Sequence, residues 1–250
     1  MIITVLTMVP EMFESFFLHP LVKRAVQKDL LELNIIDFRA YADGSFRHID
    51  ESPCGGGPGM IIRCEPVFQC LDKVRSPLSR VIALTPSGIP YTQAKAKELA
   101  GMKDIILLCG HYEGFDQRII DEADEVISVG DYVLSGGELP AMTVIDSVVR
   151  LLDGTIRSES TMEESFENSL LEYPQYTRPR TFRGRKVPDV LLSGNAELIR
   201  KWKLRESLRL TLSVRPDLLE GRTFTEEEKT ILEEIRNEKE TLERNPDHGH

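Results

Sequence analysis

The sequence predicts an α/β protein with a parallel sheet, followed by a smaller, mainly helical domain. Short apolar runs at 2–6, 34–38, 81–84 and 105–109 have the length of strands, and the last two are bounded like buried parallel strands. Helical patterns lie between these runs, and strands that alternate with helices favour layers of helices around a sheet. Beyond residue 153 the composition becomes polar and then basic, which indicates a linker and a second domain.

The helices of the first domain are predicted from proline starts and from apolar spacing. Pro10 opens a helical stretch that we expect to end near Phe17, and a second helix follows Pro20. Residues 91–99 lie between two of the predicted strands and have a helical pattern. A further helical pattern covers residues 138–152, directly after a short apolar run and a glycine-rich stretch.

Length and composition describe an ordinary globular protein. The chain has 250 residues, of which 41% are hydrophobic and 29% charged, so one large domain or two modest ones fit. No apolar run approaches the ~20 residues of a membrane span, and the N-terminal MIITVLTMVPEMF lacks the basic start of a signal peptide. The four cysteines form no Cys-x-x-Cys pair, so we expect reduced thiols, no zinc and a cytoplasmic protein.

The net charge of −10 argues against bulk nucleic-acid affinity, yet it hides a basic segment. Residues 172–215 contain eleven basic and four acidic residues, whereas residues 216–250 contain five basic and eleven acidic ones. A charge run alone is more often a solvated helix face than a binding site. Trp202 among basic residues, and the extended YPQYTRPRTFRGRK, favour a surface that binds a polyanion.

Three glycine-bearing loops follow apolar runs, at 84–88, 110–114 and 129–137. In a parallel sheet the loops at the carboxyl ends of strands converge on one crevice. The stretch SVGDYVLSGGELPA is either a long surface turn or a backbone shaped to lie against a ligand, because glycine permits close approach. Such a crevice offers main-chain donors and acceptors but few charges. It therefore suits a neutral heterocycle better than a polyphosphate.

Two familiar nucleotide-binding motifs are missing. GGGPGM, which ends a polar and glycine-rich segment at 39–60, is not followed by the Lys-Ser or Lys-Thr of a phosphate-binding loop. CGHYEG follows an apolar run but lacks the G-x-G-x-x-G spacing of a dinucleotide site. The glycine-rich pieces therefore do not predict an NTPase or a nicotinamide enzyme.

Seven segments of the chain resemble the bacterial tRNA (guanine-N1)-methyltransferase family of the SPOUT class. In chain order they are GGGPGM, LTPSG, CGHYEGFDQRI, SVGDYVLSGGELPAM, YTRP, VPDVLLSGN and IRKWKLRESL. The resemblance extends from residue 1 to about residue 220. It implies a SPOUT domain with a deep trefoil knot at 1–153, a flexible linker at 154–171 and a helical tRNA-binding domain at 172–250.

The resemblance also implies an activity. Members of the family transfer a methyl group from S-adenosyl-L-methionine to N1 of the guanosine 3′ of the anticodon in tRNA. It further implies a homodimer in which one chain completes the active site of the other, with the anticodon stem-loop as partner and no membrane association. Magnesium dependence is a family trait, although no cluster of metal ligands is visible in the sequence.

By the same resemblance, the cofactor pocket is formed by residues from the three glycine-bearing loops and from the start of the helix at 138–152. The knot would wrap the adenine with the main chain of 129–134. The expected cofactor-binding residues are Leu84, Thr85, Pro86, Gly110, Tyr112, Val129, Gly130, Asp131, Tyr132, Val133, Leu134, Gly136, Gly137 and Pro140.

Methylation of guanine N1 needs a base for the N1 proton and a donor that stabilises negative charge on O6. The resemblance assigns the donor to Arg150 and places Glu113 near the methionine end of the cofactor. The base matches Glu164, where many members carry aspartate, and Glu172 is the alternative. The expected substrate-binding residues are Gly59, Glu172, Arg178, Lys201 and Arg205.

Two other classes of protein account for part of this pattern. A non-catalytic RNA-binding protein would explain the basic segment but would not need Arg150, Glu113 and a cofactor pocket. A knotted ribose 2′-O-methyltransferase would keep the pocket but would need neither the carboxylate base nor the YTRP segment.

Overall fold

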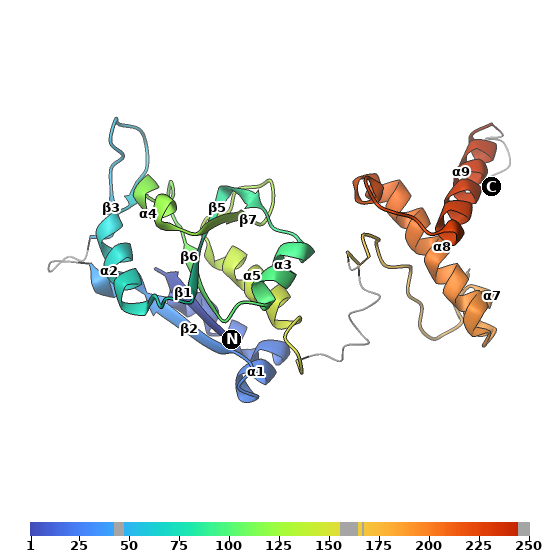
Figure 1. Ribbon diagram of the computed structural model, residues 1–250, viewed down its shortest axis with the longest axis horizontal. Coiled ribbons are helices and arrows are strands. Elements are labelled where there is room, and N and C mark those ends of the chain that lie inside the picture. Colours follow the sequence, from blue (N-terminus) through green and yellow to red (C-terminus); the bar gives the residue numbers. More distant parts are fainter. Residues whose placement is uncertain (43–47, 156–164, 167, 245–250) are drawn as a thin grey trace. The chain divides into compact units, whose positions relative to one another are not determined.

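The computed structural model describes residues 1–42, 48–155, 165–166 and 168–244, and Figure 1 shows their arrangement. The chain divides into two compact units, Met1–Arg157 and Ser158–His250. Among the described residues, no helix combines the length and the apolar character needed to cross a lipid bilayer.

The first unit is built on a five-stranded sheet in the order β2-β1-β6-β5-β7. Every strand pair in it is parallel. The sheet, together with the helical second unit, confirms the predicted fold class. The strands are β1 (Ile2–Thr7), β2 (Glu32–Asp37), β5 (Ser79–Pro90), β6 (Asp104–Cys109) and β7 (Glu125–Ser128).

The sheet is covered by helices on both faces, because successive side chains of each strand point to opposite sides. On the central strand β6, Ile105 and Leu107 pack into one apolar cluster, and Ile106 and Leu108 pack into the other. The first cluster includes buried residues of α1 (Pro20–Gln27), α3 (Gln93–Ala100) and α5 (Glu138–Val149), and the second those of α2 (Cys64–Val74) and α4 (Gln117–Glu122). The unit is therefore a three-layer α/β sandwich (Figure 1).

The helix expected from Pro10 to Phe17 is wrong in form. The segment makes two 3-10 turns, η1 (Pro10–Phe13) and η2 (Phe16–Leu18). Residues three apart eclipse each other in such turns. Phe13 and Phe16 therefore both reach the apolar core, where their rings meet edge to face.

Several boundaries differ from the sequence expectations, and in the first unit four α-helices and strands outside the five-stranded sheet were not predicted. The strand at 81–84 is the middle of the longer β5, whose pairing with β7 shifts register between Leu84 and Ile89. Helix α3 begins at Gln93 because the Thr92 side chain accepts a hydrogen bond from the Lys95 N–H and caps it. The unpredicted elements are the helices α2 and α4, and the antiparallel pair β3 (Asp50–Glu51) and β4 (Ile61–Ile62).

The second unit is mainly helical, as predicted. Its small core joins Leu208 of α8 to Leu232 and Ile235 of α9. A two-stranded hairpin, β8–β9, precedes the helices. The elements are β8 (Thr181–Phe182), β9 (Arg185–Lys186), α7 (Asp189–Leu192), α8 (Ala196–Val214), η4 (Pro216–Leu219) and α9 (Glu226–Arg244).

Replacing Leu107 by alanine should lower the free energy of unfolding of the first unit by about 2–5 kcal/mol, because the side chain is fully buried in the central strand. Urea titration followed by circular dichroism measures this loss. Leu78 is 67% exposed, so Leu78→Ala is the matched control and should change stability by no more than about 0.5 kcal/mol. Equal losses in the two variants would contradict this assignment of the core.

Candidate active site

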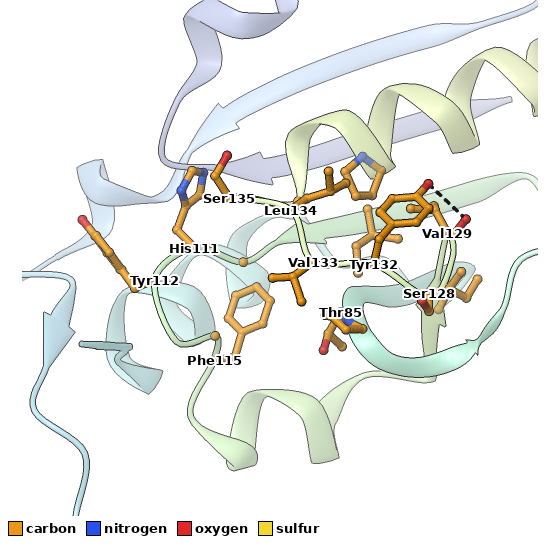
Figure 2. A pocket seen from close by; sticks show the side chains of 18 of the residues that line it. Thr85, His111, Tyr112, Phe115, Ser128, Val129, Tyr132, Val133, Leu134 and Ser135 are labelled. Carbon is orange, nitrogen blue, oxygen red and sulfur yellow. Dashed lines mark hydrogen bonds between the residues drawn. The ribbon is translucent and has the colours of Figure 1, made fainter. Parts of the chain in front are cut away.

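A pocket lies at the carboxyl ends of β6 and β7 and beside Leu84–Pro86, where the pairing of β5 with β7 shifts register, with a cavity of about 230 Å³ (Figure 2). The carboxyl ends of parallel strands share one edge of the sheet, so the loops that follow them meet there. The lining residues are Leu84, Thr85, Pro86, Gly110, His111, Tyr112, Glu113, Gly114, Phe115, Ile127, Ser128, Val129, Gly130, Tyr132, Val133, Leu134, Ser135, Gly136, Gly137 and Pro140.

The loops around the pocket are packed main chain against main chain. A Cβ on Gly88 would clash with the main chain of Ile127, and one on Gly137 would lie 2.6 Å from Cys109 Cα. The Gly137 N–H also donates to the Gly110 carbonyl at 2.8 Å. Only glycine fits at these two contacts. The contacts establish close packing of the three loops, whereas the trefoil knot itself stays a prediction.

The loop after β7 turns tightly at the mouth of the pocket. The Tyr132 N–H donates to the Gly130 carbonyl at 2.9 Å, and the Tyr132 hydroxyl donates to the Val129 carbonyl at 3.4 Å (dashed in Figure 2). The side chains of Tyr132 and Val133 are 57% and 85% exposed. This part of the chain therefore offers main-chain groups and apolar side chains to a ligand.

A buried polar chain fixes the base of the pocket. The Thr7 hydroxyl donates to Glu138 Oε1 at 2.6 Å, and Glu138 Oε2 lies 2.7 Å from His111 Nε2. Glu138 is 1% exposed and stands in the first turn of α5, where the helix dipole favours a carboxylate. Gly136 packs against both partners, since a Cβ there would lie 2.5 Å from Glu138 Oε2 and from His111 Nε2. These hydrogen bonds connect β1, the loop after β6 and α5.

The charge of the pocket excludes one class of ligand. Among the described residues that line it, Glu113 is the one acidic side chain, and no lysine or arginine is present. A polyphosphate needs cations or a free helix N-terminus. The N-terminus of α5, which begins at this pocket, already carries the Glu138 carboxylate in its first turn, so the lining suits a neutral or cationic ligand.

Glu113 joins this pocket to the glycine-rich GGGPGM loop. Its N–H donates to the Met60 carbonyl at 3.0 Å. A Cβ on Gly59 would lie 2.5 Å from Glu113 Oε1, and Gly59 has a φ of +84°, which side chains rarely adopt. The structure thus brings the expected substrate residue Gly59 against the expected catalytic residue Glu113.

The cysteines near the sheet are not nucleophiles. Burial raises the pKa of the Cys109 thiol, which directly precedes Gly110, and the nearby Glu138 carboxylate raises it further. Burial also raises the pKa of Cys70 to about 12, and burial together with a hydrogen bond to Asp116 raises that of Cys64 to about 11. All three thiols are protonated at neutral pH, and the thiolate is the reactive form. Cys54 is exposed in the loop before Gly55.

Every expected cofactor-binding residue lines the pocket except Asp131, which is exposed. Arg150 caps the C-terminal end of α5, is half-buried and does not belong to the lining. Glu164 lies outside the described residues. The roles of these residues stay predictions, because their positions do not test them.

The remaining expected substrate residues belong to the second unit. The Glu172 N–H donates to the Ser165 hydroxyl at 2.9 Å, and Arg178 is exposed before the β8–β9 hairpin. Lys201 and Arg205 lie on α8, where both are paired with carboxylates. Their roles also stay predictions.

Sequence reasoning missed part of the lining. His111, Gly114 and Phe115 belong to the CGHYEGFDQRI segment, so their place in that segment was the available signal. The other missed residues, Ile127, Ser128 and Ser135, flank the loop after β7. Within the described ranges, no group of three or more His, Cys, Asp or Glu side chains is placed to hold a metal ion.

Comparison with known proteins gives a consistent family. The model of the family described as "tRNA (Guanine-1)-methyltransferase TrmD" matches residues 1–221. Relatives named tRNA (guanine-N(1)-)-methyltransferase occur in Streptococcus mutans (50% identical, covering 94% of this chain and 98% of the relative), Geobacillus kaustophilus (48%, covering 95% and 99%) and Caldanaerobacter subterraneus (49%, covering 94% and 98%). The chain therefore belongs to the tRNA (guanine-1)-methyltransferase TrmD family.

Proposed function

We propose that the protein transfers a methyl group from S-adenosyl-L-methionine to N1 of the guanosine 3′ of the anticodon in tRNA. The observation that carries this proposal is the pocket formed by β5 and by the loops after β6 and β7, in a chain of this family. Its walls come from the LTPSG, CGHYEG and SVGDYVLSGG segments, which lie far apart in the sequence.

The pocket lining fits S-adenosylmethionine. The main chain of 129–134 offers donors and acceptors to the edge of a neutral adenine. The described lining contains no lysine or arginine, so none of these side chains would repel a cationic sulfonium. Glu113 supplies the carboxylate that such a cation favours. When bound, the cofactor supplies an electrophilic methyl carbon on its sulfonium.

The chain's own residues then deal with the proton and the charge of guanine. N1 carries a proton at neutral pH and is a poor nucleophile until that proton is removed. Glu164 accepts that proton as the N1–carbon bond forms and the sulfur–carbon bond breaks, which leaves S-adenosylhomocysteine. Arg150 donates to O6, where negative charge grows. Glu172 is the alternative base.

The guanine must leave its stack before this can happen, because its Watson–Crick edge is otherwise paired or stacked. The contact of Gly59 with Glu113 supports an entry route for the base along the GGGPGM loop. A side chain at Gly59 would occupy the space beside Glu113.

We further propose that the active form is a cytoplasmic homodimer with shared sites. Arg150 stands at the end of the 12-residue helix α5, about 18 Å along the axis from Glu138 at the pocket. An arginine at that distance reaches the pocket of a second copy more easily than the pocket of its own chain. The exposed apolar side chains of Ile89, Val133 and Leu139 support a covering partner, and four free thiols fit a reducing compartment.

Labelled S-adenosylmethionine incubated with unmodified tRNA should give N1-methylguanosine at the position 3′ of the anticodon. Nuclease mapping and mass spectrometry of the nucleosides identify the product. The matched control is the same tRNA with adenosine at that position, which should stay unlabelled. Label on a ribose 2′-oxygen, or RNA binding without any transfer, would favour the competing classes instead.

Gly137→Ala should weaken binding of S-adenosylhomocysteine by about ten- to hundredfold, because the added methyl forces the loop away from the main chain of Cys109. Calorimetry measures the affinity, and circular dichroism verifies the fold. Gly101→Ala is the control, since a Cβ there meets nothing closer than 3.4 Å. Equal affinities in the two variants would argue against a wall set by this contact.

Glu164→Gln should lower single-turnover methylation by about 10²–10⁴-fold, because glutamine keeps the shape but cannot take a proton. Cofactor and tRNA affinities should stay near those of the wild type, since only the transition state uses the proton transfer. Glu164→Asp should keep much of the rate. If Glu164→Gln reacts at the wild-type rate while Glu172→Gln is inactive, Glu172 is the base.

A further inference from the structure

Two groups of basic residues in the second unit have different surroundings. The α8 group consists of Arg200, Arg205 and Arg209, which lie along one helix. The hairpin group spans the β8–β9 hairpin and the residues before it, and consists of Arg178, Arg180, Arg183, Arg185 and Lys186.

The α8 group is neutralised by carboxylates of α9. Arg200 Nη2 lies 2.6 Å from Glu227 Oε1 and 2.9 Å from Glu197 Oε1. Arg205 pairs with Glu234 and Glu238, each at 2.5 Å, and Arg209 lies 3.5 Å from Glu238. Exposed pairs of this kind are weak one by one. They nevertheless cancel the local charge, and a phosphate must compete with a carboxylate at each arginine.

The hairpin group has no such partners. All five side chains are exposed, and residues 178–186 contain no Asp or Glu. None of the five forms an ion pair within the described part of the chain. As far as the described residues show, these five cations lie close together in the sequence without a paired carboxylate, which is the charge pattern that attracts a phosphate backbone.

The hairpin also presents an aromatic ring on a defined turn. Thr181 pairs with Lys186, and Phe182 pairs with Arg185. The turn residues Arg183 and Gly184 have φ values of +50° and +79°, the left-handed conformation of a two-residue hairpin turn. Phe182 is 61% exposed, with the Arg183 guanidinium 5.3 Å from its ring centre.

Arg183 is an unfavourable residue for its own turn. Asparagine and glycine adopt the left-handed region more readily than arginine does. Turn geometry alone therefore does not account for an arginine at this position, whereas a role for its charge does.

We propose that the hairpin at residues 178–186, and not the arginine face of α8, is the RNA-contacting surface of the second unit. Its cations bind backbone phosphates, and Phe182 stacks on an unpaired base. The proposal rests on the proposed function in taking tRNA as the RNA. It differs from the expectation that Lys201 and Arg205 contact the substrate, and the pairing of both residues with carboxylates is the reason for preferring the hairpin.

RNA fits this surface better than an anionic membrane. Apart from Pro179 and Gly184, which serve the path of the main chain, the segment has one apolar side chain, Phe182. A single ring suits stacking on one base, whereas a membrane-binding surface buries a broad apolar face.

The test compares two triple variants that change the net charge equally. The hairpin variant is Arg183→Asn/Arg185→Gln/Lys186→Gln, in which asparagine suits the left-handed turn position. The matched control is Arg200→Gln/Arg205→Gln/Arg209→Gln on α8, where glutamine keeps helix propensity. Fluorescence anisotropy with labelled tRNA over a range of KCl concentrations gives the affinity and its salt dependence.

The hairpin variant should lose about two to three from the slope of log K against log[salt], and on the order of a hundredfold in affinity at 0.15 M salt. The α8 variant should keep a slope within about one of the wild type's. Phe182→Ala should weaken binding by about tenfold without changing the slope, and Phe182→Trp should restore it. If the hairpin variant loses its helical circular dichroism signal, Arg185→Gln and Lys186→Gln singly should each reduce the slope by about one.

A larger loss in the α8 variant, or wild-type affinity in the hairpin variant, would overturn the proposal. Binding of the hairpin to phosphatidylserine vesicles, with RNA affinity unchanged in the variant, would overturn it as well. Methylation by the wild type is assayed in parallel. Hairpin-dependent RNA binding without N1-methylation would refute the proposed function and leave the assignment of this surface intact.

Discussion

The pocket depends on main chain packed against main chain along β5 and β7 and in the loops after β6 and β7. At Gly88 and Gly137 the neighbouring backbone leaves no room for a Cβ. The loops are therefore held at a fixed separation by the sheet, and the pocket walls consist largely of peptide groups. Helix α5 begins directly after Gly137, so the same contact also fixes the position of the start of that helix.

In the second unit, ion pairs and a small apolar core hold α8 and α9 together. The acidic α9 is not merely a solvated helix, since its glutamates hold the arginines of α8 while Leu232 and Ile235 pack on Leu208. The basic hairpin stands outside this arrangement. A count of charges over 172–215 combines these two environments, and it overstates how much of the basic charge is available to a polyanion.

The sequence predicts elements whose signals are local and misses contacts between distant residues. Strand β6 was predicted because five consecutive apolar residues are bounded by Asp104 and Gly110. Helix α2 was missed although Pro66 stands in its first turn, where a proline favours a helix start. The hydrogen bond from Thr7 to Glu138 joins residues that are 131 positions apart, and no local sequence pattern predicts such a contact. The cofactor-binding residues came from the family motifs, while the ion pairs on α8 needed the structure.

The exposure of Cys54 gives the protein a built-in attachment point. The thiols of Cys64, Cys70 and Cys109 have raised pKa values and lie half-buried or buried, so a thiol reagent at neutral pH reacts first at Cys54. That residue precedes the glycine-rich loop that reaches Gly59 and Glu113. An environment-sensitive dye attached there would report in real time when a ligand occupies this loop, in the unsubstituted chain.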